Sequence, residues 1–214
     1  TLSPLEKTEA RGDLQLGVAG GHVLLDLKGG LVPGENPFEA AFDFPLSGGL
    51  FAGVVKGRIG NLDLIWPWYG AQGHADYTAD VKETETKAKV AVVLDVEAPI
   101  MPLPGFAYAI TDFTASGNYL DDVLTIASLG GKLGGGDIRG SGEVGIGESG
   151  IATMDLRLEA KDMVLSPMER MRAQADGTLR LLKDKKRFVT EGELLFKRLT
   201  WRREIYEEFG FSSE

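Results

Sequence analysis

Apolar residues recur at every second position over much of this chain. The clearest example runs from Lys89 to Glu97, where apolar residues stand at positions 90, 92, 94 and 96. Side chains two residues apart on a β-strand point to the same face of a sheet. The same spacing recurs at 14–18, 23–27, 62–66, 124–126, 144–146, 156–158, 179–181 and 194–196. No segment keeps a helical period, so the sequence predicts an all-β chain with short connections.

Glycine is the second feature that constrains the fold. The chain has 29 glycines in 214 residues, and ten of them fall between positions 130 and 150. Gly134-Gly135-Gly136 is not followed by the Gly-Lys-Ser/Thr of a phosphate-binding loop or by a helix pattern. Glycine within β-structure marks bulges, tight bends and close approach of another backbone. These glycines therefore predict a sheet that bends strongly, into a trough.

Composition excludes several classes of function. The chain has no cysteine, which rules out disulfides, thiolate metal sites and a thiol nucleophile. It has two histidines, which leaves little for a histidine metal site or a serine-type triad, so we expect no cofactor and no enzyme. The 23 basic and 32 acidic residues give a net charge of −9, which argues against a nucleic-acid partner. No segment has the roughly 20 apolar residues of a membrane-spanning helix.

Individual polar motifs are better explained by structure than by chemistry. We interpret Asp121-Asp122 as a turn, since Asp favours turns, rather than as a catalytic or cation-binding pair. His74 has no partner at ligand spacing, so we interpret it as a surface or strand residue. The Trp66-Pro67-Trp68-Tyr69 group is either a strand end packed on the core or a platform for a sugar or a lipid interface. Packing is the favoured interpretation.

The last 50 residues contain two local signals. Ser166-Pro167-Met168-Glu169 has the pattern of a helix capping box, but alternation continues through Met171, Ala173 and Ala175, so a turn followed by a strand is favoured. Leu179–Leu182 and Phe188–Phe196 predict a hairpin with the basic cluster Lys183–Arg187 at its tip. That cluster is either a solvated loop, which is favoured, or a contact for anionic lipid headgroups or an acidic partner.

Several segments between residues 108 and 205 share a pattern of short strands and glycines. A strand at Asp112–Leu120 leads into the pattern Leu-x-Ile-x-x-Leu-x-Gly-Lys-Leu at Leu124–Leu133 and then into a glycine-flanked strand at Gly136–Val144. Three later segments contain similar strands: Met154–Ala160, Asp176–Leu181 and Glu191–Phe196. This pattern resembles the AsmA-like/TamB family of bacterial envelope proteins, which ends its repeats in similar glycine-x-leucine strands. The first hundred residues fit more loosely, through Gly53–Ile59. The chain departs from the family in being far shorter and in having no membrane anchor, so we expect it to be a segment of a longer protein.

The resemblance implies an elongated, strongly curved, mainly antiparallel sheet, with an apolar concave face and a polar outside. We expect residues 1–214 to form one groove segment, which could consist of two repeats at about 1–105 and 106–214. It also implies a periplasmic protein anchored in the inner membrane that carries phospholipid between the membranes, with acyl chains as its ligand and a TamA-like outer-membrane barrel protein as a partner. The candidate groove residues are Leu62, Leu64, Val90, Val92, Leu94, Val96, Leu124, Ile126, Val144, Ile146, Leu156, Leu158, Leu179, Leu181, Leu194 and Phe196.

Two other functions remain open. The chain could be a scaffold or chaperone module whose sheet edge pairs with strands of a barrel protein during its insertion. It could also be a closed β-domain that binds glycans through Trp66, Trp68 and Tyr69. One bent sheet with an open apolar interior would favour the lipid groove, whereas two sheets packed against each other would favour the glycan-binding domain.

Overall fold

The computed structural model shows an all-β chain built as one antiparallel sheet, as the sequence predicts. It describes residues 9–32, 36–60, 62, 71–85, 87–102, 108–147, 150–166, 170–184 and 187–201. The twelve strands are β1 (Glu9–Ala19), β2 (His22–Val32), β3 (Asn36–Pro45), β4 (Ala52–Ile59), β5 (Gln72–Glu83), β6 (Ala88–Pro102), β7 (Ala109–Leu120), β8 (Val123–Leu133), β9 (Gly136–Gly147), β10 (Gly150–Leu165), β11 (Met171–Asp184) and β12 (Arg187–Trp201).

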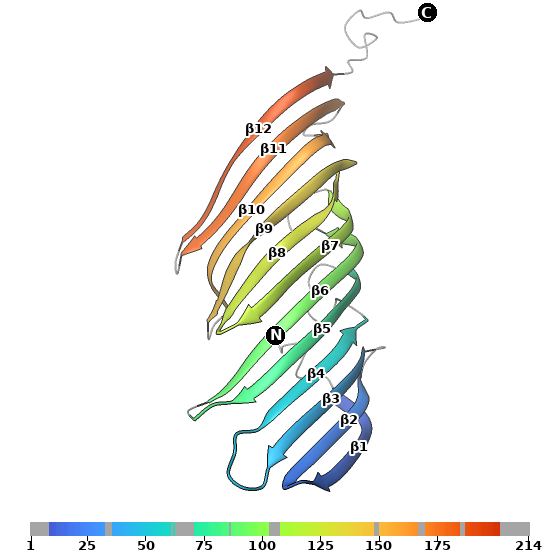
Figure 1. Ribbon diagram of the computed structural model, residues 1–214. Coiled ribbons are helices and arrows are strands. Elements are labelled where there is room, and N and C mark those ends of the chain that lie inside the picture. Colours follow the sequence, from blue (N-terminus) through green and yellow to red (C-terminus); the bar gives the residue numbers. More distant parts are fainter. Residues whose placement is uncertain are drawn as a thin grey trace, which may run out of the picture.

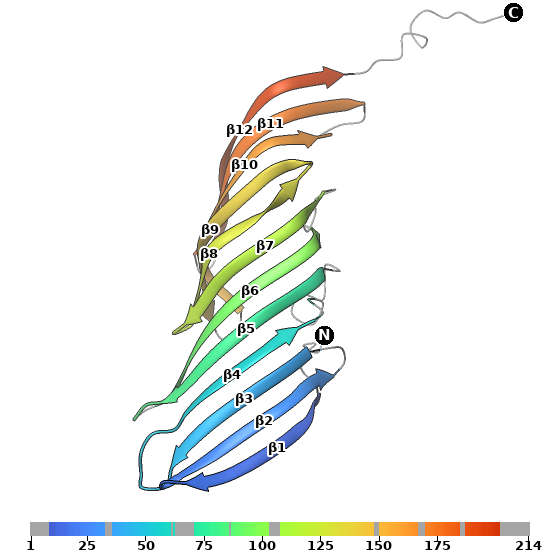
Figure 2. The same cartoon turned by 45° about the vertical axis from the view of Figure 1, so that its right-hand side comes forward.

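Each strand pairs with its neighbours in sequence, so the sheet order is β1 to β12 without a crossover. Figures 1 and 2 show an elongated sheet in which every strand crosses the long axis obliquely and curves along its length. The described strands form a single layer. One continuous ladder therefore spans both of the predicted repeats.

The hairpin turns explain part of the glycine content. Gly20-Gly21 joins β1 to β2, and Gly134-Gly135 joins β8 to β9, all with positive φ. Asp121-Asp122 joins β7 to β8 with φ of 46° and 64°. Two-residue hairpin turns of type I′ have positive φ at both positions, which glycine adopts without strain and Asp tolerates. The interpretation of Asp121-Asp122 as a turn is therefore confirmed.

Bulges bend the strands along a line that runs across the sheet. The pairing registers place an extra residue in β7 beside Asp112 (φ 50°), in β10 beside Asp162 (φ 57°) and in β12 beside Lys197. In β6 the extra residue lies next to Ala98, which pairs with Phe113 of β7. Because a bulge kinks its strand and increases the twist, neighbouring bulges act together to curl the sheet.

The core lies beside these bulges. Its buried residues form one cluster, of Leu62, Ala71, Ala75, Ala98, Ile110, Phe113, Ile138, Ala160 and Met163. Nearly all of them are strand residues from one face of the sheet. The exceptions are Leu62 and Ala71, which belong to the connection between β4 and β5.

The prediction of a strand at 62–66 is wrong at Leu62. β4 ends at Ile59, and the N–H of Gly60 donates to the side-chain Oδ1 of Asn36 at 2.7 Å instead of a strand carbonyl. The chain leaves the sheet there, and Leu62 packs into the buried cluster, with 3 % of its surface exposed. Residues 64 and 66 lie outside the described residues.

The interpretation of the last 50 residues is confirmed where the structure describes them. β10 ends at Leu165 and β11 begins at Met171, so strand alternation and not a helix follows the turn. β11 and β12 form the predicted hairpin. The basic cluster is only partly at its tip, because Lys183 belongs to β11 and Arg187 to β12.

Candidate functional site

One face of the sheet is apolar from the first strand to the last, and we call it the groove face. The strand registers align its residues in rows that cross all twelve strands. One row consists of Leu14, Leu27, Ala40, Val55, Ala79, Val92, Tyr119, Leu124, Val144, Met154, Lys183 and Phe188. The next row consists of Gly12, Gly29, Phe38, Gly57, Tyr77, Leu94, Gly117, Ile126, Gly142, Leu156, Leu181 and Thr190.

The second row contains five glycines, and two kinds of close contact account for them. A Cβ atom added to Gly57 would lie 2.5 Å from Oη of Tyr77, closer than real Cβ contacts, so this glycine makes room for a large side chain. At Gly12, Gly29, Gly117 and Gly142, the atom nearest to an added Cβ is a backbone oxygen of the paired strand. These four glycines therefore allow the close approach of another backbone, which is a usual reason for glycine in a strand.

We infer that the groove face is the concave face of the sheet. The strand residues that are almost fully buried, such as Ile110, Phe113 and Met163, all lie on it. These side chains are covered by one another where the strands curve, and by Leu62 from the connection between β4 and β5. The buried cluster follows the line of bulges, whereas Val90 and Phe188, at the hairpin ends of their strands, remain exposed. The groove-face side chains are thus buried along the line of bulges. They are exposed toward the opposite ends of the strands, where the β5–β6 and β11–β12 hairpins turn.

Charge is confined to the rim of this face. Among the described strand residues, alternation places two charged side chains on it, Glu83 and Lys183, and both stand at the hairpin ends of their strands. The Glu83 carboxylate accepts a hydrogen bond from the N–H of Phe51 at 3.2 Å, and Lys183 Nζ donates to the carbonyl of Ile151. Tyr77 lies deeper, where burial raises the pKa of its phenol above the usual value.

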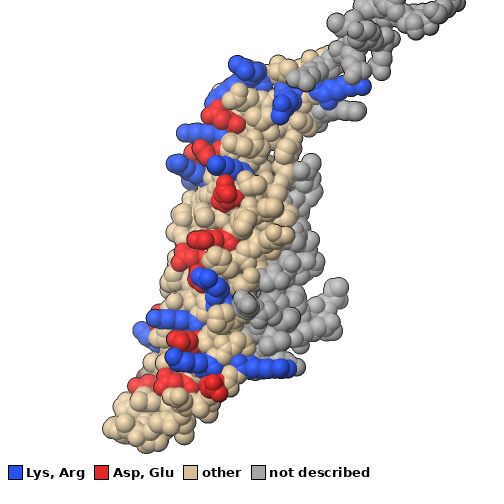
Figure 3. All heavy atoms as spheres, turned by 90° about the vertical axis from the view of Figure 1, so that its right-hand side faces the viewer, with Lys and Arg blue, Asp and Glu red and all other residues tan. Residues whose placement is uncertain are grey.

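The opposite, outer face carries the charged side chains (Figure 3). Ion pairs link adjacent strands across it, as in Lys28–Glu39 at 3.1 Å and Lys197–Asp176 at 2.7 Å. Exposed pairs of this kind contribute little stability individually. Their main consequence is to specify which face contacts solvent, because the reverse orientation of the sheet would bury charged side chains.

Two arginine–aspartate pairs on the outer face have two-pronged geometry. Arg58 donates from Nε and Nη2 to the Asp76 carboxylate at 2.7 and 2.8 Å, and Arg180 contacts Asp155 in the same way at 2.8 and 2.7 Å. Hydrogen bonds from the guanidinium favour the charged carboxylate, so the pKa of each Asp lies below its usual value.

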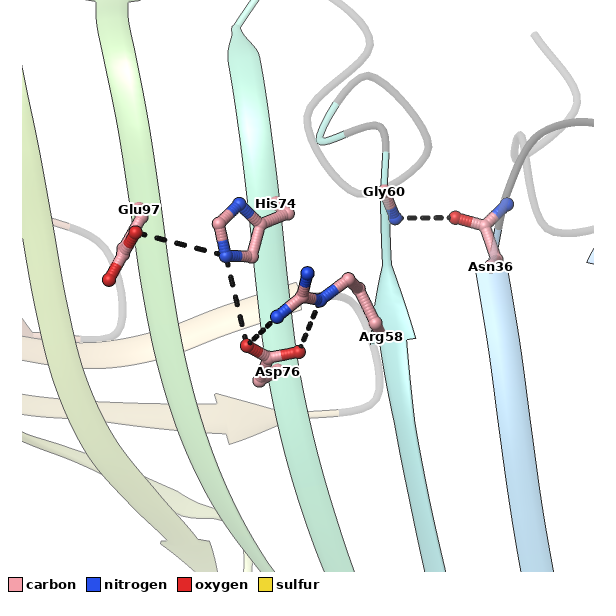
Figure 4. Close-up of polar contacts among 6 residues, drawn as sticks. All are labelled: Asn36, Arg58, Gly60, His74, Asp76 and Glu97. Carbon is pink, nitrogen blue, oxygen red and sulfur yellow. Dashed lines mark hydrogen bonds and ion pairs between the residues drawn. The ribbon is translucent and has the colours of Figure 1, made fainter.

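His74 is an outer-face residue of β5, as Figure 4 shows. Its Nε2 lies 3.7 Å from Asp76 and 3.8 Å from Glu97. The prediction of a strand or surface histidine is therefore confirmed. Within the described ranges no group of three residues is arranged to hold a metal ion.

The structure brings nearly all described candidate groove residues together on the groove face. They occupy β6, β8, β9, β10, β11 and β12, and Leu62 joins them from a connection instead of a strand. Leu64 and the aromatic group at 66–69 lie outside the described residues.

Sequence reasoning missed the groove-face residues of β3 and β5 and the buried end of β7. Phe38 and Phe42 could have been predicted, because apolar residues stand at every second position of β3, at 38, 40, 42 and 44. Tyr77 gave no such signal, since His74–Asp80 mixes polar and small residues. Ile110 and Phe113 are three residues apart, and only the bulge puts them on one face.

Comparison of the chain with protein-family models, with curated proteins and with solved structures found no match. In the part of the chain that the structure describes, no helix is long and apolar enough to cross a membrane.

Proposed function

We propose that the chain is a non-enzymatic groove segment that carries phospholipid acyl chains along its concave face. The observation that supports this is the two rows of groove-face residues, which run over twelve strands with charge only at the rim. Strands lie about 4.8 Å apart, so a twelve-strand row is about 50 Å long. An acyl chain fills about 15 Å, half the hydrocarbon core of a bilayer. The groove face is long enough for several chains.

The energetics favour a continuous surface over a pocket. Exposing an acyl chain of about 16 carbons to water costs about 12 kcal/mol, at about 0.8 kcal/mol per methylene. Half-buried residues such as Val92 and Leu94 offer apolar surface that offsets much of this cost at every step. Because the two rows carry no charged side chain before Lys183 of β11, an acyl chain moving along them from β1 to β10 does not have to displace water from a charged group. Such transport needs no catalytic group.

The resemblance to AsmA-like/TamB proteins supports a matching cellular role. On this proposal the segment lies in the periplasm, within a protein anchored in the inner membrane, and moves phospholipid between inner and outer membranes. Its solvent-exposed outer face carries ion pairs such as Arg58–Asp76, which suits an aqueous compartment.

Neighbouring residues on opposite faces of β6 provide the test. A photo-crosslinking amino acid replaces Leu94, on the groove face, or Val93, on the outer face, in cells that make the full-length protein. Val93 is 55 % exposed, so accessibility alone favours it. We expect phospholipid adducts at 94 and not at 93. Equal labelling at both positions, or none at 94, would refute the proposal.

A charge substitution adds a second test. Leu94→Glu puts a carboxylate into the middle of the second row, and we expect it to abolish lipid that co-purifies with the protein. Val93→Glu is the matched control, because it adds the same charge to the outer face, and lipid content should not change. Circular dichroism establishes that both variants keep their strand content.

A scaffold role is the second candidate, and the geometry of β12 favours it. Every residue of β12 is exposed, and its outer edge pairs with no described strand. An edge that pairs with no described strand can add a strand from another protein, such as a nascent outer-membrane barrel. Capture of a barrel protein that survives Leu94→Glu would support this role.

A further inference from the structure

The loop between β3 and β4 presents apolar side chains to solvent at the rim of the groove. Leu46 is 63 % exposed and Leu50 is 53 % exposed. The sequence has no charged residue from Phe44 through Val55. Figures 1 and 2 show this loop projecting from the lower left of the sheet, beyond the strands that it joins.

Hydrogen bonds and stacked rings hold the loop in this projecting form. The N–H of Leu46 donates to the carbonyl of Gly21 at 2.8 Å, and the N–H of Glu83 donates to the carbonyl of Phe51 at 2.9 Å. Behind the leucines, the Phe44 ring stacks on Phe51 with centroids 5.5 Å apart. The loop is anchored on both sides, so the leucines cannot readily fold back to bury themselves.

Two ionisable groups beside the loop have hydrogen-bonding partners, whereas Lys82, opposite Ala52, belongs to the outer face of β5. His22 Nδ1 contacts Asp43 Oδ1 at 2.7 Å, and the Glu83 carboxylate accepts from the Phe51 N–H. In the view of Figure 3 the lowest part of the molecule, at the β1–β3 end, presents no Lys, Arg, Asp or Glu. A surface that inserts into hydrocarbon must lack charge, and residues 44–55 carry none.

We propose that this loop is a bilayer-contacting tip, with Leu46 and Leu50 entering the apolar part of a lipid membrane. A specific protein partner would need about 800 Å² of complementary surface with a polar rim. A six-residue tip of Leu, Ser, Gly and Phe does not supply this, whereas a bilayer requires only exposed apolar area on a rigid support.

The tip is continuous with the groove face. Phe44 pairs with Val23, and Phe42 pairs with Leu25 on one side and Gly53 on the other, all within groove-face rows. Phe42 and Phe44 lie with ring centroids 6.1 Å apart. Apolar side chains therefore lead without interruption from the tip into the groove. The inference does not require that the groove carry lipid, because insertion of the tip stands on its own exposure and support.

Single-cysteine labelling tests the inference, because the chain has no cysteine of its own. Leu46→Cys and Leu50→Cys are each labelled with an environment-sensitive fluorophore and mixed with phosphatidylcholine vesicles. We expect a blue shift and strong quenching by lipids brominated deep in their acyl chains. Leu195→Cys is the control, since Leu195 is as exposed but lies on the outer face of β12, and its label should not change.

A double substitution provides the second measurement. Leu46→Glu with Leu50→Glu should weaken flotation with the vesicles by about tenfold or more, since two leucines no longer enter the bilayer. Both side chains are exposed, so the urea midpoint should stay at the wild-type value. Labels at 46 and 50 that remain aqueous in the presence of vesicles, or flotation unaffected by the double substitution, would overturn the inference. A label that shifts only on addition of a protein partner would overturn it equally.

The two proposals fail separately. Loss of tip insertion with retained phospholipid adducts at position 94 leaves the lipid groove intact. Tip insertion without adducts at position 94 would support the membrane contact and refute the lipid groove.

Discussion

Substitution of Gly57 tests whether glycine is required where large side chains lie over the groove face. A Cβ at this position would lie 2.5 Å from Tyr77 Oη, 2.6 Å from its Cζ and 2.8 Å from the backbone oxygen of Pro37. The tyrosine could rotate away, but the Pro37 oxygen moves only if β3 shifts. Overpacking of this kind costs about 1–3 kcal/mol, so we expect Gly57→Ala to destabilise the fold by that amount.

Gly17 is the matched control, because it is also a strand glycine without a positive φ. A Cβ added there meets no atom within 4 Å. Gly17→Ala should therefore stabilise the fold by about 0.4–1 kcal/mol, through the reduced entropy of the unfolded chain. The two variants should differ by about 1.5–4 kcal/mol, which is about 3–15 °C in Tm for a chain of this size.

Thermal unfolding followed by circular dichroism, with urea unfolding as a second probe, measures the difference. Equal melting temperatures for Gly57→Ala and Gly17→Ala would refute the argument that crowding on the groove face demands glycine. In that case the glycines would be explained by backbone flexibility alone.

Two further predictions concern titration. Because Arg180 lowers the pKa of Asp155 in the folded state, the pair contributes stability above about pH 4, the unfolded value, and loses it as pH falls through the lowered pKa. Asp155→Asn should therefore lower the urea midpoint at pH 6, and the deficit should shrink at pH 3; a deficit independent of pH would contradict this. Burial raises the pKa of Tyr77, and an acyl chain in the groove should raise it further by excluding water. Tyrosinate absorbance of wild type minus Tyr77→Phe, with and without bound lipid, measures the shift, and an unchanged pKa would place the lipid elsewhere.

Much of the groove face could be predicted from single strands. In β6, alternation alone assigns Val92 and Leu94 to one face and Asp95 to the other, because the side-chain period of a strand is two. The Asp121-Asp122 turn could also be predicted, since few residues tolerate positive φ at both positions of a tight hairpin. These features depend on neighbours along the chain, and local sequence is sufficient to specify them.

The sequence by itself determined that this protein is an antiparallel β-structure with one apolar side and many bends. Only the tertiary structure decided how the sides of twelve strands join into one surface. Bulges reset the alternation, as beside Asp112 and Asp162, so that Ile110 and Met163 fall on the groove face out of step with the rest of their own strands. The position of Leu62 outside the sheet likewise depends on a long-range contact, the hydrogen bond between Asn36 and Gly60. Alternation is a property of one strand. The register between strands, the curvature of the sheet and the burial of side chains arise from hydrogen bonds and packing between residues far apart in the chain.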